Sequence, residues 1–349
     1  MTSVSGWRLW GAILGPVASR VRLSAAWAGG VSIAASASAS AAIPMFIGLK
    51  DDFTRPVRLM AQSSYTQLMI LHWLMPELPE VETTRRGIDA VITGRTLTRL
   101  VIHESRMRWP IPQDLPSLVA GRAVLECARR GKYLLLRFEH GTQIVHLGMS
   151  GSLRSVAPGE FLRKHDHVEW IFEQAVLRLH DPRRFGAVLW HPESDGPIEA
   201  HPLLAKLGIE PFDPRFDGAW LHRHFKNHSA AIKQVLLAGM AVVGVGNIYA
   251  SESLFRARIN PKTPANKLSP ARCERLADMV RATLADALTS GGSTLRDYVG
   301  ATGEPGAYFE IHAAVYEREG LPCRVCATPI RRIVQGQRAT YYCPKCQRS

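Results

Sequence analysis

The sequence predicts an α+β protein of several domains: an N-terminal β-sandwich with flanking helices, a C-terminal helical domain and a small metal-binding ribbon. Three observations support this fold class. Short strand-like runs fill residues 96–190, the apolar period becomes helical after His201 and Pro202, and two Cys-x-x-Cys pairs stand near the end. At 349 residues the chain is also too long for one compact core.

Composition limits the class of protein further. Hydrophobic residues make up 46% and charged residues 21%, which excludes a disordered chain and collagen-like or coiled-coil repeats. The formal net charge of +13 suits an anionic partner, either nucleic acid or an acidic membrane surface, although a solvated basic surface would also account for it. Six cysteines are too few for a disulfide scaffold, so we expect a reducing compartment.

The first 75 residues differ from the rest. Residues 25–49 carry no charge and are long enough to span a membrane, but they are rich in Ala and Ser and only weakly apolar. The Arg- and Ser-containing start also has features of a transit peptide. We expect residues 1–75 to lie outside the working protein, either as upstream sequence read from an early start or as a removed segment.

The elements of the body follow in order. A helix over 79–92 is expected because Pro79 suits a first helical position, Glu80 and Glu82 lie in the first turn, and Gly94 follows. Next come strand-like runs, which predict a sandwich or barrel. They cover residues 96–102, 123–128, 132–138, 142–147, 167–172, 176–180 and 186–190.

Four helices are expected after residue 202, over 216–226, 229–238, 246–257 and 269–290. The last is the clearest, because Ser269 is a natural N-cap, Pro270 fits the first position and Gly291 follows the end. The Gly-rich segment 291–309 predicts a mobile loop.

The Cys-x-x-Cys pairs carry the strongest chemical signal. Sixteen residues separate the two pairs, a spacing typical of a structural zinc ribbon with four thiolate ligands; two disulfides or idle thiols are the alternatives. The stretch between them predicts a hairpin that turns near Gln335 and Gly336, and its Arg and Lys residues suit phosphate binding. Such a zinc has a closed shell and would fold the module rather than catalyse. The four expected ligands are Cys323, Cys326, Cys343 and Cys346.

Two Gly-rich motifs suggest contacts with DNA. In GVGNIYASE (244–252), the glycines permit close approach, and Asn247 is expected to cap a helix whose free N–H groups hold a phosphate; a plain turn is the alternative. In HLGMSGSL (146–153) and HDPRRFG (180–186), Met149 and Phe185 are flanked by Gly and Arg. That setting suits a probe pushed into a DNA stack, whereas core packing is the ordinary role of such residues.

The segment Pro76-Glu77-Leu78-Pro79-Glu80 gains meaning if it is a mature N-terminus. A terminal amine titrates near 7.7–8.0, and a helix dipole aimed at it lowers its pKa further. Pro76 would then be a competent nucleophile, and its secondary amine becomes an iminium when it attacks a sugar's anomeric carbon. Glu77 could supply or take the proton.

These motifs occur in one order and together resemble bacterial formamidopyrimidine-DNA glycosylases, which excise oxidised purines such as 8-oxoguanine. The resemblance covers residues 76–348 and rests on PELPEVETTRRG, RRGKYLLL, HLGMSGSLR, KHDHVEW, DPRRFG, GVGNIYASESLF and CRVC…QRATYYCPKC. It implies a catalytic β-sandwich domain over 76–207, a helix–two-turn–helix domain with a lesion-covering loop over 208–310, and a zinc ribbon over 311–349.

The resemblance also implies roles for single residues. Pro76 is the nucleophile that forms a Schiff base, Glu77 its acid/base partner, Lys132 a second catalytic group, and Arg338 a phosphate contact that assists β,δ-elimination. The implied DNA contacts are His165, Arg183, His228 and Asn247, with Met149, Arg183 and Phe185 filling the gap left by the extruded base. One structural Zn²⁺ and damaged double-stranded DNA are the expected cofactor and partner. We expect no nucleotide cofactor and no contact with a membrane. The protein is expected to be a cytoplasmic monomer.

Three departures from the family pattern bear on these expectations. An extension before Pro76 turns its amine into an amide. His228 stands where the family often has Lys or Arg, and Ala307 adds a residue to the usual GYF of the lesion loop. The alternatives are an oxidised-pyrimidine glycosylase of the same superfamily, whose members tend to begin PEGPE, a non-catalytic DNA-binding protein if the extension is kept, and a membrane-attached protein.

Overall fold

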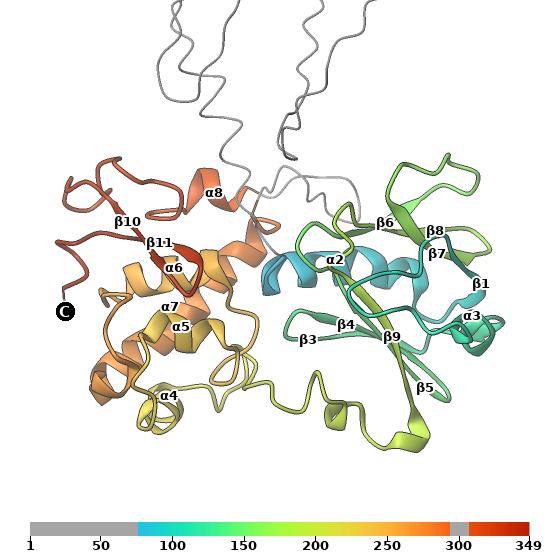
Figure 1. The fold of residues 1–349 in the computed structure, drawn as a ribbon, viewed down its shortest axis with the longest axis horizontal. Coiled ribbons are helices and arrows are strands. Elements are labelled where there is room, and N and C mark those ends of the chain that lie inside the picture. The colour runs from blue at the N-terminus through green and yellow to red at the C-terminus, as the bar shows by residue number, and fades with distance from the viewer. Residues whose placement is uncertain (1–75, 294–306, 349) are drawn as a thin grey trace, which may run out of the picture. The chain divides into compact units, whose positions relative to one another are not determined.

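The computed structural model describes residues 76–293 and 307–348, which fall within one compact unit over His72–Ser349 (Figure 1). The predictions for residues 1–75 and for most of the loop 291–309 therefore lie outside the described residues. Within the described part, no helix is both long and apolar enough to cross a bilayer.

Helix α2 (Leu78–Ile92) confirms the first expected helix. Glu77 is its N-cap, and the backbone N–H of Glu77 donates to Glu80 Oε2 at 2.9 Å, which is half of a capping box. Val81, Ile88 and Ile92 recur at helical spacing and are buried, so this face packs into the β-sandwich.

Two antiparallel sheets form the sandwich, as predicted. One has the order β2-β1-β7-β8-β6 and the other β3-β4-β5-β9 (Figure 1). Between them Trp170, fully buried, donates its indole N–H to Gln143 Oε1 at 2.7 Å. The strands are β1 (Thr96–Ile102), β2 (Arg122–Ala123), β3 (Glu126–Arg130), β4 (Tyr133–Phe138), β5 (Gly141–His146), β6 (Ser152–Val156), β7 (Asp166–Phe172), β8 (Val176–His180) and β9 (Ala187–Pro192).

Two details of the expected strands were wrong. The run 123–128 is not one strand, because the chain passes from one sheet to the other within it: β2 pairs with β1, whereas β3 pairs with β4. Strand β6 was missed because its first two residues, Ser152 and Leu153, belong to the Gly-rich HLGMSGSL segment, which has the composition of a loop. A short helix, α3 (Leu115–Val119), was missed as well.

The part of the chain after residue 202 that precedes the ribbon is called the helical lobe below. Its four expected helices are present as α4 (Gly218–Phe225), α5 (Ile232–Leu237), α6 (Asn247–Arg256) and α7 (Pro270–Thr289). Ser269 caps α7 as predicted, since its side chain accepts the N–H of Arg272. Helix α5 is shorter than expected, because Ala230 and Ile232 form backbone hydrogen bonds with Ala265 and Thr263 instead. Three 3₁₀ turns cover Glu193–Asp195, Ile198–Ala200 and Ala265–Lys267.

The short helix α8 (Tyr308–Ile311) precedes the ribbon, which contains the hairpin of β10 (Arg331–Gln335) and β11 (Arg338–Tyr342). Gly336 and Gln337 both have positive φ, 54° and 62°, which is typical of a tight two-residue turn. The predicted hairpin is thus confirmed. Buried Glu252 of α6 accepts the backbone N–H groups of residues 314–316, which fixes the ribbon to the helical lobe.

The RRG segment at the end of β3 joins the sandwich to the helical lobe. Glu210 accepts from Arg129 at 2.9 Å, from Arg130 at 3.1 Å and from the backbone N–H of Gly131 at 2.7 Å. Arg129 also binds Glu82 of α2 at 3.0 Å. These bonds hold Lys132, the next residue along the chain, at the junction of the two lobes.

Candidate active site and metal centre

The carboxylate of Glu77 caps a helix that lies about 170 residues further along the chain. It accepts three backbone N–H groups at the start of α6: Gly246 at 2.7 Å, Ile248 at 2.9 Å and Tyr249 at 3.3 Å. Gly246 is required here, because a Cβ at that position would lie 2.2 Å from Glu77 Cδ. This contact fixes the residue after Pro76 against the helical lobe.

The cap of α6 corrects the expected role of Asn247. The N-cap is Gly246 and Asn247 is the first helical residue, so the helix N-terminus binds Glu77 and does not present those N–H groups to a phosphate. Asn247 instead donates its side-chain amide to Tyr316 Oη at 3.2 Å, and its buried Oδ1 has no hydrogen-bond partner among the described residues. The side chain remains a candidate DNA contact, which is still a prediction.

Glu80 forms a second buried carboxylate beside Glu77. Its Oε1 accepts from Tyr249 Oη at 2.6 Å and from both the N–H and the hydroxyl of Ser293 at 2.8 Å. Glu80 therefore ties the start of α2 to α6 and to the last described residue before the segment 294–306. It has a positioning role that the sequence did not indicate.

Burial sets the protonation of this cluster. It raises the pKa of Glu77 to about 7, against the opposing effects of Lys132 and of the backbone N–H donors. Burial likewise lowers the pKa of Lys132, while Glu77 raises it and Arg338 lowers it further. The structure thus brings Glu77, Lys132 and Arg338 within electrostatic range of one another, with a carboxyl group poised to exchange a proton near neutral pH.

Pro76 is buried and directly precedes the N-cap of α2. Its nitrogen therefore lies near the positive end of α2, and the adjacent carboxylate lies on the positive end of α6. The positive ends of α2 and α6 both disfavour a protonated, cationic amine at Pro76. They would therefore lower the pKa of a free Pro76 amine.

Lys233 is a site residue that the sequence did not reveal. This lysine of α5 is fully buried, and its ammonium donates to Ala339 O at 3.0 Å and to Thr340 Oγ1 at 2.8 Å. Burial lowers its pKa to about 7, and Glu77 and Arg338 lie close enough to affect it. Lys233 supports β11 directly after Arg338 and thereby positions that arginine.

The residues expected to fill the gap left by the extruded base, called the wedge residues below, are Met149, Arg183 and Phe185. They lie on two loops that the Asp181 carboxylate joins. Asp181 is fully buried and accepts from Ser150 Oγ at 2.9 Å and from the Gly186 N–H at 2.7 Å. A Cβ at Gly148 would lie 2.4 Å from the backbone of Phe185 and Gly186, so the loops are in direct contact. Met149 and Phe185 are therefore neighbours in space, as a two-part probe requires.

The other candidate DNA contacts divide between the lobes. The Arg183 guanidinium lies 4.6 Å from the centre of the Phe185 ring, and the carbonyl of His165 accepts the Asp181 N–H at 3.0 Å, so both belong to the wedge region. His228 lies elsewhere, in the turn after α4, where its ring stacks on His224 at 5.0 Å. Arg338 is exposed at the first position of β11. The role of each in binding DNA stays a prediction.

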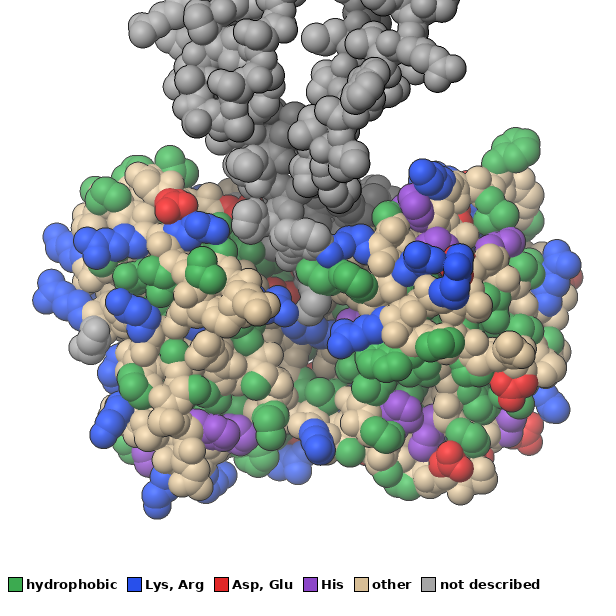
Figure 2. Space-filling view, in the orientation of Figure 1, with side chains coloured by type: hydrophobic (Ala, Val, Ile, Leu, Met, Phe, Trp, Pro, Cys, Tyr) green, Lys and Arg blue, Asp and Glu red, His purple; other side chains and the backbone are tan. Residues whose placement is uncertain are grey.

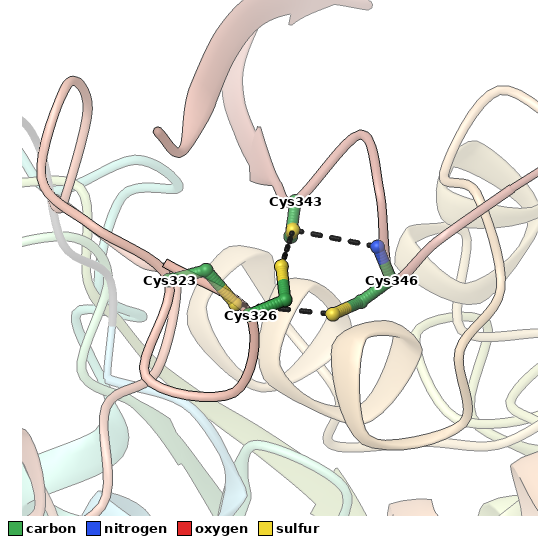
Figure 3. A group of neighbouring side chains, drawn as sticks. All are labelled: Cys323, Cys326, Cys343 and Cys346. Carbon is green, nitrogen blue, oxygen red and sulfur yellow. Dashed lines mark hydrogen bonds between the residues drawn. The ribbon is translucent and has the colours of Figure 1, made fainter. Parts of the chain in front are cut away.

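The four cysteines of the ribbon converge on one point (Figure 3). Their sulfur atoms lie within 4.8 Å of one another, with Cys326–Cys343 at 3.4 Å and Cys323–Cys346 at 3.9 Å. A tetrahedral Zn²⁺ with bonds of about 2.3 Å needs sulfurs about 3.8 Å apart, so the donors fit this ion. All four thiols are free, which excludes the disulfide alternative.

Backbone groups add to this metal centre. The Val325 N–H donates to Cys323 Sγ at 3.5 Å, and the Cys346 N–H donates to Cys343 Sγ at 3.4 Å. Such donors stabilise thiolates, the form that binds zinc. The four-thiolate set leaves no open position, so the zinc is structural, as predicted.

Three family models match the chain. The Formamidopyrimidine-DNA glycosylase N-terminal domain matches residues 75–188, the Formamidopyrimidine-DNA glycosylase H2TH domain matches 207–299, and the zinc finger found in FPG and IleRS matches 320–348.

Curated relatives agree with these matches. A formamidopyrimidine-DNA glycosylase of Bordetella petrii is 82% identical over 274 residues, which are 78% of this chain and all of the relative. Those of Bordetella pertussis and Burkholderia vietnamiensis are 78% identical over 274 residues and 60% over 276, with the same coverage.

Solved structures share the fold. The MutM (Fpg) protein of Thermus thermophilus is 40% identical with a TM-score of 0.70, and 78% of this chain and 98% of that chain are covered. A complex of Lactococcus lactis Fpg with DNA that contains an abasic site is 30% identical with a TM-score of 0.72, and it covers 78% of this chain and all of that one.

Proposed function

The chain belongs to the formamidopyrimidine-DNA glycosylase family, and from this premise we propose how its own residues remove a damaged base. It is a bifunctional DNA glycosylase and AP lyase that excises oxidised purines through a Schiff base and then cleaves the strand by β,δ-elimination. The observation that carries the residue assignments is the Glu77 carboxylate, buried beside Pro76 and coupled to Lys132.

The free amine of Pro76 is the proposed nucleophile. Its nitrogen attacks C1′ of the damaged nucleotide, the glycosidic bond breaks, and the bonding electron pair leaves with the base, which takes up the proton that the Pro76 nitrogen gives up. The sugar ring opens as O4′ accepts a second proton, and the product is an iminium between the Pro76 nitrogen and C1′. A tertiary amide at Pro76 has no free electron pair for this step, so the active form needs an unacylated residue 76.

Glu77 is the proposed proton donor for ring opening. A carboxyl group with a pKa of about 7 is partly protonated at neutral pH, unlike an exposed glutamate. Once it has given up its proton, the carboxylate is held by the three N–H groups of α6 and balances the positive iminium next to it. The same carboxylate can then take a proton from C2′ and start the elimination.

Lys132 and Arg338 are proposed to act on the phosphates of the flipped nucleotide. Both cations lie in electrostatic range of the Glu77 cluster, and Lys233 holds the strand that carries Arg338. A guanidinium at the 3′ phosphate stabilises the charge that develops when this phosphate leaves. Arg338 would therefore serve elimination more than base release.

The wedge loops are proposed to fill the duplex where the base has left. Extrusion of a nucleotide costs a few kcal/mol of unstacking, and less for a damaged pair. Met149 and Phe185 offer apolar surface to the exposed stack, and Arg183 adds a positive charge above the Phe185 ring. His165, anchored to Asp181, and Asn247 are proposed phosphate contacts, whereas His228 would contribute to binding only when protonated.

The working enzyme is proposed to consist of 76–207, 208–310 and 311–349. In support, the relatives from Bordetella match 274 residues of this chain over their full length. Ala307 closes the lesion loop, since its N–H donates to Ser290 O and the Tyr308 N–H to Gly292 O. The added residue thus lies at the base of the loop. Damaged duplex DNA is the proposed partner, and the bacterial cytoplasm the place of action.

Excision on defined duplexes tests this function. We expect the protein to release 8-oxoguanine and to leave phosphates at both ends of the gap, the result of β,δ-elimination. A duplex with thymine glycol serves as the comparison, and preferential excision of that oxidised pyrimidine would contradict the assigned substrate class. DNA binding without strand cleavage would instead indicate a non-catalytic protein.

A further inference from the structure

Four cationic side chains surround a hollow at the zinc end of the ribbon, away from the Glu77 cluster. Its volume is about 470 Å³. Arg258 follows the end of α6, Arg272 lies in the first turn of α7, and Lys345 and Arg348 stand on either side of Cys346. None of the residues that line this basic pocket is acidic.

The charges of the basic pocket are not neutralised within the described residues, where none of the four cations forms an ion pair. The N-terminus of α7, a helix of 20 residues, adds the positive end of its dipole beside Arg272. A zinc ion with four thiolates carries a net charge of −2, so the four cations keep the region positive when the metal is bound. Figure 2 shows Lys and Arg side chains along the edge of the molecule where Figure 1 places the ribbon and the C-terminal end.

The basic pocket is separate from the catalytic cluster. Strand β11 runs from Arg338 to Tyr342, and Cys343 follows it. At about 3.3 Å per residue, the ribbon therefore carries its cysteine end about 17 Å from Arg338. A phosphate held here is not the one that Arg338 would contact at the lesion.

We propose that the basic pocket binds the phosphodiester backbone of DNA outside the nucleotide under repair. Two arginine guanidinium groups and the side chains of Lys345 and Arg348 suit phosphate oxygens, which accept charge-assisted hydrogen bonds. The proposal rests on the proposed function only in that DNA is the partner. The phosphate belongs either to the flanking part of the bound duplex or to a second duplex.

A double variant, Arg258→Gly with Arg272→Gln, removes two of the cations and should preserve the fold. Arg258 has φ of +56°, a conformation in which glycine is unstrained. Arg272 is the third residue of α7 after Ser269, where Gln completes a capping box. Zinc content and the melting temperature report folding, and both should match the unmodified protein.

The first measurement is the salt dependence of binding to an undamaged duplex of about 30 base pairs, roughly 100 Å long at 3.4 Å per pair. Each lost phosphate contact lowers the slope of log K against log salt by about 0.9, so two lost contacts lower it by about 1.8. The affinity deficit of the double variant should then be about 12-fold larger at 50 mM than at 200 mM salt. This result assigns the pocket to the flanking DNA.

The second measurement distinguishes a second duplex. Release of a labelled duplex is followed while the concentration of unlabelled duplex rises. An unchanged salt slope together with a weaker acceleration by competitor assigns the pocket to transfer between DNA segments. Arg99→Gln with Arg122→Gln, two exposed arginines of β1 and β2, makes the matched control for net charge.

The proposal is overturned if the double variant behaves as the unmodified protein in both measurements, or if the control pair changes them equally. In the first case the pocket would be free for an acidic protein partner. Because both measurements use undamaged DNA, their failure is distinct from a failure to excise 8-oxoguanine, which would count against the proposed function alone.

Discussion

Replacing Glu77 by Gln removes the proton and the charge of the residue beside the nucleophile while keeping its size. Both carboxylate oxygens accept backbone N–H groups of α6, Oε1 from Ile248 and Oε2 from Gly246 and Tyr249. Gln has one oxygen, so its NH₂ group must face at least one of these donors whichever way the amide lies. A buried N–H without an acceptor costs about 1–3 kcal/mol.

Removing the buried charge of Glu77 stabilises the folded protein, which opposes the cost of the unpaired N–H group. The size of this gain depends on pH. The pKa of Glu77 is raised from 4.5 when the chain is unfolded to about 7 in the folded protein. Between these values the folded state binds more protons than the unfolded state, so the stability of the unmodified protein falls as pH rises through this window. The fall amounts to about 3 kcal/mol. Glu77→Gln should lack this fall, and denaturant unfolding at about pH 5 and about pH 8 measures it.

Excision gives the functional readout of Glu77→Gln. Single-turnover release of 8-oxoguanine should fall by about 10²- to 10⁴-fold, the usual contribution of a general acid or base. Borohydride trapping on a preformed abasic site should fall much less, because an open aldehyde needs no ring opening. Glu126→Gln is the control, since Glu126 is an exposed carboxylate of β3 that binds only Arg137 among the described residues. Excision by Glu77→Gln at the unmodified rate would refute the assignment.

Three further substitutions test other parts of the molecule. Pro76→Gly should keep folding and DNA binding but slow the covalent step, because a primary amine replaces the constrained secondary one; unchanged single-turnover rates would argue against Pro76. Cys343→Ser should release zinc and weaken DNA binding, as metal analysis and a binding titration would show; a metal-free variant of full activity would disprove the ribbon's role. Lys233→Met leaves Ala339 O and Thr340 Oγ1 without their donor, at a cost of about 1–3 kcal/mol. It should reduce strand cleavage more than base release, and equal losses of both would contradict positioning of Arg338.

The parts of the fold that local pattern determines were predictable. The Ser269 cap of α7, the strand runs other than β6 and the turn at Gly336 are all set by neighbouring residues. Where the chain changes sheets, at 123–126, no local signal marks the break, because both halves have strand composition. Strand β6 was missed because the glycines just before it give this segment the composition of a loop.

The candidate site divides in the same way. The order of the motifs indicated Pro76, Glu77 and the cysteines, but the partner of Glu77 is a helix end about 170 residues away, which only tertiary packing reveals. Lys233 looks like an ordinary surface charge of a short helix and is fully buried. Asp181 lies just before Arg183 and Phe185 in sequence, yet its role in joining their loop to that of Met149 follows from the contact of the two loops in space.

Peptide mapping of the borohydride-reduced adduct tests the central claim most directly. Natively expressed protein is trapped on a duplex with 8-oxoguanine, digested, and analysed by mass spectrometry for the residue that carries the sugar. We expect the sugar remnant on the nitrogen of Pro76, as the first residue of its peptide. A remnant on Lys132 or Lys233, or an active chain in which Met75 is still joined to Pro76, would contradict the mechanism.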